Sequence, residues 1–128
     1  MSGVVSRWLG SVESLPEIAQ RLLRVQIENR PALEAIRLYD DTRTLFYCDP
    51  PYPHESRGDS KAYGYEMTDD DHLKLSQVLD GIKGMAAVSG YRCDVMDTLY
   101  KGWRKIESAG KKCHSIKKTR TEALWMNY

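Results

Sequence analysis

At 128 residues the chain is long enough for one small domain with a moderate core, and we expect a single domain over residues 1–128. Its net charge of +1 favours no class of partner. No apolar run approaches the ~20 residues that a membrane-spanning helix needs, so we expect no membrane span.

The three cysteines, Cys48, Cys93 and Cys113, lie far apart and without C-x-x-C spacing. An odd, scattered set of this kind fits reduced thiols, so we expect a cytoplasmic protein. His114 directly follows Cys113, and neighbours on an extended segment point to opposite faces, so this pair does not favour a zinc site. We therefore expect no metal.

The first elements precede a short apolar run. Residues 1–14 are weakly patterned, and apolar residues four apart predict a short helix over Glu17–Leu23, followed by a strand over Arg24–Ile27. The next helix has Pro31 in its first turn and runs to Tyr39. The apolar run Thr44–Cys48 then predicts a buried strand.

A polar stretch, Pro53–Tyr65, follows and predicts a surface loop of functional length. Thr68 with Asp71 three residues later is a capping signature, and three consecutive acids suit the positive end of a helix. We interpret the acidic run as the start of a helix rather than as a metal site, with Leu73, Val78 and Leu79 on its apolar side.

The rest of the chain alternates between strands and helices. We expect a strand over Met85–Ser89, a helix over Asp94–Tyr100, a strand over Arg104–Ser108, a basic turn or arm over Ala109–Lys118 and a last strand over Arg120–Tyr128. This alternation predicts an α/β fold with right-handed crossovers and a mainly parallel sheet, ending in an antiparallel hairpin.

The strand over Thr44–Cys48 ends at Asp49-Pro50-Pro51-Tyr52. Prolines cannot continue a central strand, so Asp49 is expected at the carboxyl end of the strand, where open α/β sheets bind ligands. Proline has no N–H, so the loop presents only acceptors, the Asp49 carboxylate and main-chain carbonyls. Beside the flat Tyr52 ring, these acceptors suit the exocyclic amino group of a stacked base. The alternative is structural: a strand end followed by a packed tyrosine.

Asp-Pro-Pro-Tyr after an apolar strand resembles the catalytic motif of the DNA adenine-N6 methyltransferases, in particular the Dam-like class. The resemblance runs from about Leu15 to Tyr128 and includes Val25–Asn29, Ser89-Gly90-Tyr91 and Arg120–Tyr128 in the family's order. It implies the carboxyl-terminal part of a Rossmann-like methyltransferase fold, S-adenosylmethionine as cofactor and DNA as partner.

The resemblance also implies roles for the motif residues. Asp49 and the Pro50 carbonyl would accept hydrogen bonds from the adenine N6 amino group and stabilise the charge that develops on it. Tyr52 would stack on the base after it leaves the duplex. Asp49 would also contact S-adenosylmethionine, and Pro51 would hold the loop.

The donor site of this family depends on an early Phe-x-Gly-x-Gly-like strand and turn. Here the only phenylalanine is Phe46 and no G-x-G occurs, so we expect a partial chain that lacks the first strands and is inactive alone. Three interpretations are open: half of an enzyme that needs an amino-terminal half, a non-enzymatic DNA-binding or assembly module, and an amino-methyltransferase for RNA or protein. Missing strands would leave exposed edges, so self-association is also expected.

Between Lys101 and Arg120 lie eight lysines or arginines and one acid, Glu107. Charge alone supports a solvated hairpin and a phosphate-binding surface equally. The resemblance favours the second interpretation. The expected DNA contacts are Lys111, Lys112, Lys117, Lys118 and Arg120.

Overall fold

The computed structural model describes residues 3–56, 64–109, 111–112 and 119–128. The chain divides into two compact units, Met1–Arg30 and Pro31–Tyr128. The predicted site residues all belong to the second unit.

The first unit contains α1 (Gly3–Leu22), a helix without a buried side chain. The expected helix over Glu17–Leu23 is thus only its last part. Apolar residues at a spacing of three and four, Val5, Trp8, Val12 and Leu15, continue the helix towards its start. No helix in the described part of the chain is long and apolar enough to cross a membrane.

The prediction of a strand over Arg24–Ile27 is wrong, because these residues form no strand. A strand needs a neighbour to satisfy its backbone N–H and C=O groups, and no described segment pairs with this one. Ile27 is accordingly 88% exposed. A local apolar pattern does not reveal whether such a neighbour exists.

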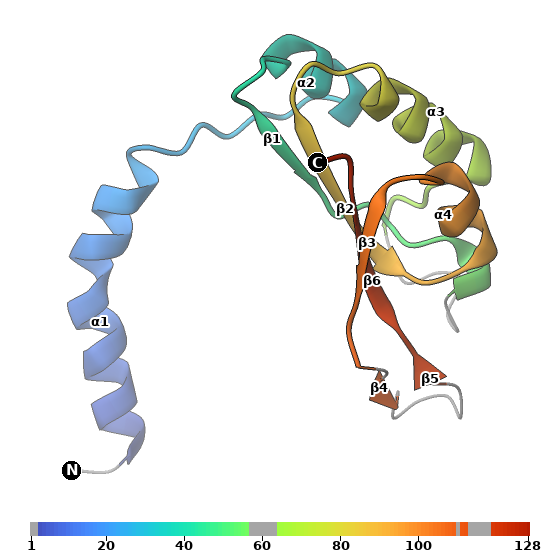
Figure 1. Cartoon of the computed structure of the whole chain (residues 1–128). Coiled ribbons are helices and arrows are strands. Elements are labelled where there is room, and N and C mark those ends of the chain that lie inside the picture. The colour runs from blue at the N-terminus through green and yellow to red at the C-terminus, as the bar shows by residue number, and fades with distance from the viewer. Residues whose placement is uncertain (1–2, 57–63, 110, 113–118) are drawn as a thin grey trace. The chain divides into compact units, whose positions relative to one another are not determined.

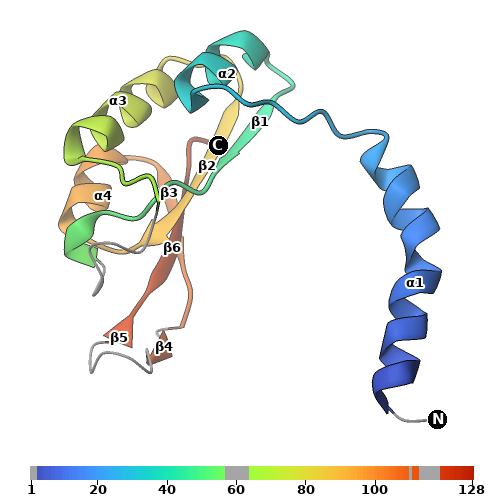
Figure 2. The same ribbon diagram turned by 180° about the vertical axis from the view of Figure 1, so that it is seen from behind.

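The second unit is built on a four-stranded sheet of β1 (Leu45–Cys48), β2 (Met85–Tyr91), β6 (Glu122–Met126) and β3 (Arg104–Glu107), in that spatial order (Figures 1 and 2). β1 and β2 pair in parallel, whereas β6 runs antiparallel to both of its neighbours. The α/β class and the terminal antiparallel hairpin are confirmed. The prediction of a mainly parallel sheet is wrong for the described strands, because β6 lies between β2 and β3 and runs antiparallel to both.

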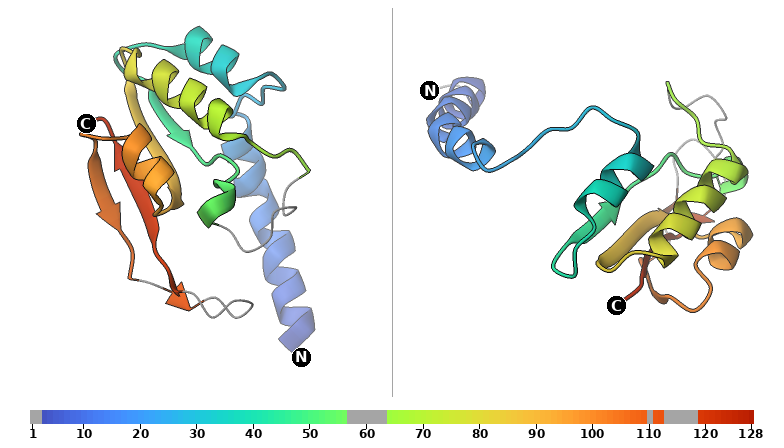
Figure 3. Two further views of the ribbon diagram at one scale, coloured as in Figure 1. Left: turned by 90° about the vertical axis from the view of Figure 1, so that its right-hand side faces the viewer. Right: turned by 90° about the horizontal axis from the view of Figure 1, so that it is seen from above.

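Three helices cover one face of this sheet: α2 (Ala32–Tyr39), α3 (Asp69–Asp80) and α4 (Asp94–Leu99) (Figure 3). We call this the covered face. Its core contains Leu79 of α3, Val88 of β2, Met96 of α4 and Trp125 of β6, each at most 1% exposed. The final strand thus completes the core that the helices share.

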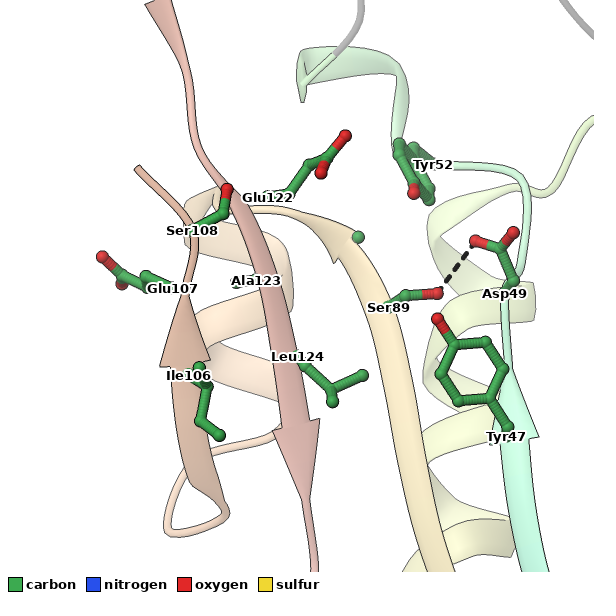
Figure 4. A pocket seen from close by; sticks show the side chains of 11 residues that line it. Tyr47, Asp49, Tyr52, Ser89, Ile106, Glu107, Ser108, Glu122, Ala123 and Leu124 are labelled. Atoms are coloured by element: carbon green, nitrogen blue, oxygen red, sulfur yellow. Dashed lines mark hydrogen bonds between the residues drawn. The ribbon is translucent and has the colours of Figure 1, made fainter. Parts of the chain in front are cut away.

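The opposite face, which carries Tyr47, Ser89, Leu124 and Ile106, is the open face, and no described helix of residues 31–128 packs on it (Figure 4). Because neighbouring residues of a strand point to opposite faces, Phe46 and Cys48 of β1 pack on the core while Tyr47 is 65% exposed. β1 pairs only with β2, so its second edge has no partner among the described strands. The expected buried strand is therefore a half-buried edge strand.

The start of α3 confirms the capping signature. The Thr68 hydroxyl accepts a hydrogen bond from the Asp71 N–H at 3.2 Å, and the Thr68 N–H donates to the Asp71 carboxylate at 3.0 Å. Leu79 faces the core as expected, but Leu73 is 42% exposed. The buried stripe instead contains Leu75, because residues 72, 75, 76 and 79 face the sheet.

The turn before β2 sets the register of the parallel pair. The Asp40 carboxylate accepts the Lys83 N–H at 2.9 Å and the Gly84 N–H at 3.0 Å. A Cβ atom at position 84 would lie 2.7 Å from the Thr44 carbonyl oxygen and 2.8 Å from that of Asp41. This close approach of two backbones admits only glycine, and it precedes the pairing of Leu45 with Met85.

The basic segment after β3 continues as a ribbon. β4 (Lys111–Lys112) pairs antiparallel with β5 (Thr119–Arg120), which leads into β6. A short 3-10 helix, η1 (His54–Ser56), follows the motif. These two segments extend the second unit beyond its sheet.

Candidate functional site

Asp49 follows β1 directly and lies at the carboxyl end of that strand, as predicted. Its side chain is exposed, and its Oδ1 accepts a hydrogen bond from the Ser89 hydroxyl of β2 at 2.9 Å (Figure 4). The same hydroxyl lies 3.2 Å from the Cys48 carbonyl oxygen. Within the described residues no lysine or arginine pairs with Asp49, so its carboxylate still has acceptor capacity for a ligand.

Cys48, the residue before Asp49, points the other way, into the covered face. Burial raises the pKa of the Cys48 thiol, which keeps it protonated and a poor nucleophile. The chemistry available at this corner is therefore that of the neighbouring carboxylate.

A hollow of about 360 Å³ opens beside Asp49 on the open face (Figure 4). The motif side of the hollow is formed by Tyr47, Asp49, Tyr52 and Ser89, and the hairpin side by Ile106, Glu107, Ser108 and Glu122 to Leu124. Its walls combine two phenol rings and aliphatic side chains with the carboxylates of Asp49 and Glu122. The Glu107 carboxylate points away from the hollow and pairs with the Lys105 ammonium at 3.0 Å (Figure 4). The hollow therefore offers flat apolar surface together with hydrogen-bond acceptors.

Tyr52 stands at the edge of the hollow and packs against Tyr91, the last residue of β2. The two ring centroids are 4.8 Å apart with the planes at 78°, an edge-to-face contact. The guanidinium carbon of Arg120 lies over the Tyr91 ring, 5.2 Å from its centroid. Arg120 is thus connected to Tyr52 through one intervening ring.

The predicted motif residues are brought together. Asp49 and Tyr52 line the same hollow, and the half-buried Pro50 and Pro51 form the chain between them. A salt bridge that neutralised Asp49, or the absence of a hollow beside Tyr52, would have contradicted the sequence interpretation. Among the described residues no salt bridge neutralises Asp49, and a hollow does lie beside Tyr52. The catalytic roles of these residues remain predictions.

The predicted DNA contacts are only partly described. Lys111 and Lys112 form β4, and Lys117 and Lys118 lie outside the described residues. Arg120 lies over Tyr91, a contact within the protein that the charge pattern does not indicate. Binding of DNA by this hairpin remains a prediction.

No role was predicted for Ser89 or for the residues on the hairpin side of the hollow. Ser89 could have been placed beside Asp49, because β1 and β2 are parallel and their carboxyl ends meet at one edge of the sheet. Glu122 and Leu124 had no such signal. They reach the hollow only because β6 lies between β2 and β3.

Comparison with known families agrees with this geometry. Residues 10–121 match the family model described as D12 class N6 adenine-specific DNA methyltransferase. No curated protein matches the chain. The match covers most of the chain, including the motif and strands β1 to β5, and ends at the residue before β6. The chain belongs to the D12 class N6 adenine-specific DNA methyltransferase family.

Proposed function

We propose that this chain is the catalytic part of an S-adenosylmethionine-dependent DNA adenine-N6 methyltransferase. The observation that carries the proposal is the exposed Asp49 carboxylate, held by Ser89 at the carboxyl end of β1 and facing a hollow that it shares with Tyr52. The strand order β1-β2-β6-β3 supports it, because the resemblance implies the same terminal hairpin.

The target nitrogen is a poor nucleophile, since its lone pair is delocalised into the purine ring. In the proposal the Asp49 carboxylate and the Pro50 carbonyl accept hydrogen bonds from the two N6 hydrogens. These bonds favour a tetrahedral nitrogen and stabilise the positive charge that develops on it during transfer. Tyr52 stacks on the flipped base and aligns N6 with the acceptors.

The donor supplies a methyl group bound to a positively charged sulfur. The carboxylates of Asp49 and Glu122 beside the hollow suit a positive group, so this end of the donor fits the residues present. The adenosine end does not, because the sequence has no G-x-G turn that would let backbone approach it closely. We therefore propose that Asp49 holds the reactive end of the donor and that an amino-terminal part supplies the rest of the site.

The test is a radiolabelled methyl-transfer assay on mixed-sequence duplex DNA, with the chain alone and with the amino-terminal part of a family member added. We expect transfer only in the mixture, and we expect Asp49→Ala to abolish it. Asp69→Ala, which removes an exposed acid from the first turn of α3, is the matched control and should retain activity.

Transfer that survives Asp49→Ala would overturn the assignment of Asp49. Methylation of RNA or protein but not of duplex DNA would show an amino-methyltransferase with a different substrate. Transfer by the chain alone would overturn only the need for a second part.

A second function, DNA binding without methyl transfer, is favoured by the basic β4–β5 ribbon together with the missing glycine turn. Neutralising Lys111, Lys112, Lys117 and Lys118 would then abolish retention of DNA, whereas Asp49→Ala would leave it unchanged. The same pair of variants in the transfer assay separates the two functions.

A further inference from the structure

Arg120 was expected at a DNA phosphate, yet its guanidinium lies over the Tyr91 ring at 5.2 Å. A cation over the face of an aromatic ring is attracted by the ring quadrupole. Tyr91 in turn contacts Tyr52 edge-to-face at 4.8 Å. The side chains of Arg120, Tyr91 and Tyr52 therefore form a row from the base of the basic ribbon to the hollow.

The backbone around Tyr52 is fixed on both sides. Pro51 restricts it before the ring, and Pro53, which follows, is fully buried. The Pro53 carbonyl also accepts hydrogen bonds from the Ser56 N–H at 3.0 Å and the Ser56 hydroxyl at 2.7 Å. The direction of the Tyr52 ring then depends on its side-chain contacts, of which the Tyr91 ring is one.

Tyr91 and Arg120 are themselves held by the sheet. Tyr91 pairs with Glu122 across β2 and β6, and the neighbouring Arg92 N–H donates to the Thr121 carbonyl at 2.9 Å. Arg120 pairs with Lys111 in the ribbon. Backbone pairing thus holds the main chain from which the Tyr91 and Arg120 side chains extend.

We propose that Tyr91 and Arg120 are positioning residues for Tyr52: they fix its ring at the edge of the hollow, ready to receive the target base. This rests on the proposed function, because it takes Tyr52 as the residue that stacks on the base. Arg120 acts on the base through two rings, and its loss affects catalysis rather than attachment to the DNA backbone.

The first experiment needs no activity. In the chain, the ring protons of Tyr52 lie in the ring current of Tyr91, so their NMR signals are displaced from those of a free tyrosine. Tyr91→Leu should move them towards the free value, Tyr91→Phe should leave them in place, and Arg120→Gln should broaden or partly move them. The indole signal of the buried Trp125 serves as the folding control. Unchanged Tyr52 signals in Tyr91→Leu would overturn the proposal.

The second experiment separates positioning from phosphate binding. In the complemented transfer assay, Tyr91→Leu and Arg120→Gln should lower kcat about threefold to tenfold with an unchanged KM for DNA, the range expected for one aromatic contact. Tyr91→Phe, which keeps the aromatic ring, should retain the wild-type rate. In a double-mutant cycle with Tyr52→Ala, the effects should not add.

The salt dependence of DNA binding tests the alternative that Arg120 contacts a DNA phosphate. If Arg120 contacts a phosphate, Arg120→Gln reduces the slope of log affinity against log salt by about one, as a lost phosphate contact does. The proposal expects an unchanged slope for Arg120→Gln and uses Lys112→Gln, a charge loss in the same ribbon, for comparison. A reduced slope with unmoved Tyr52 signals overturns it.

Different results would contradict the proposed function and the positioning of Tyr52 by Tyr91. If the wild-type mixture does not methylate DNA while Tyr91→Leu still moves the Tyr52 signals, the proposed function fails and the positioning contact stands. If the mixture methylates DNA and Tyr91→Leu changes neither the rate nor the signals, only the positioning proposal fails.

Discussion

The two faces of the sheet are made by the same four strands and have opposite roles. On the covered face, Val88 and Trp125 are buried under three helices. On the open face, Tyr47 of β1 and Ile106 of β3 stay exposed and border the hollow with Asp49. Because successive side chains of a strand point to opposite faces, alternate residues of each strand contribute to the buried core or to the candidate site. Substitutions on the two faces should therefore have separable effects.

The largest expected effect is on the covered face. Trp125→Ala removes a side chain that is 1% exposed and should lower the free energy of unfolding by about 3–5 kcal/mol, because it leaves a cavity under the helices. Tyr47→Ala, on the open face, should cost less than about 1 kcal/mol. Urea unfolding followed by circular dichroism measures both. Similar losses of unfolding free energy at the two positions would contradict the separate roles of the two faces.

A smaller effect is expected at the turn that sets the register between β1 and β2. Gly84→Ala places a Cβ atom 2.7 Å from the Thr44 carbonyl oxygen, a backbone atom that cannot turn away, and should cost about 1–3 kcal/mol. Gly81→Ala is the matched control, since its Cβ atom would lie at an ordinary 3.7 Å from the Val78 carbonyl oxygen. Thermal unfolding of the two variants tests the difference. Equal melting temperatures would mean that the turn relaxes.

The smallest effect concerns a helix of the covered face. Thr68→Val removes the cap of α3 and should cost about 1 kcal/mol near neutral pH. The side-chain and backbone hydrogen bonds of Thr68 lower the pKa of Asp71 below its ordinary 3.8. A lowered folded-state pKa gives stability that is present above pH 3.8 and is lost as the pH falls through the folded value. Unfolding at about pH 7 and about pH 2 should therefore show a smaller gap between wild type and Thr68→Val in acid. A gap that stays constant would exclude Asp71 as its source.

Local signals in the sequence predicted the parts that depend on neighbouring residues. The prolines after Asp49 placed it at the end of a strand, and Thr68 with Asp71 marked the start of α3. Contacts between distant segments were not predictable. The place of β6 between β2 and β3, which brings Glu122 and Leu124 to the hollow, depends on long-range pairing. The contact of Arg120 with Tyr91 has no local pattern, because it follows from that pairing.

The second edge of β1, which has no partner among the described strands, has a consequence for how the protein is handled. Leu45–Cys48 presents backbone donors and acceptors along one side, and Leu45 and Tyr47 add exposed apolar surface beside them. Whichever extended segment reaches this edge first extends the sheet. Refolding in the presence of the complementing part should yield completed molecules, whereas concentrating the chain first should favour growth by copies of itself.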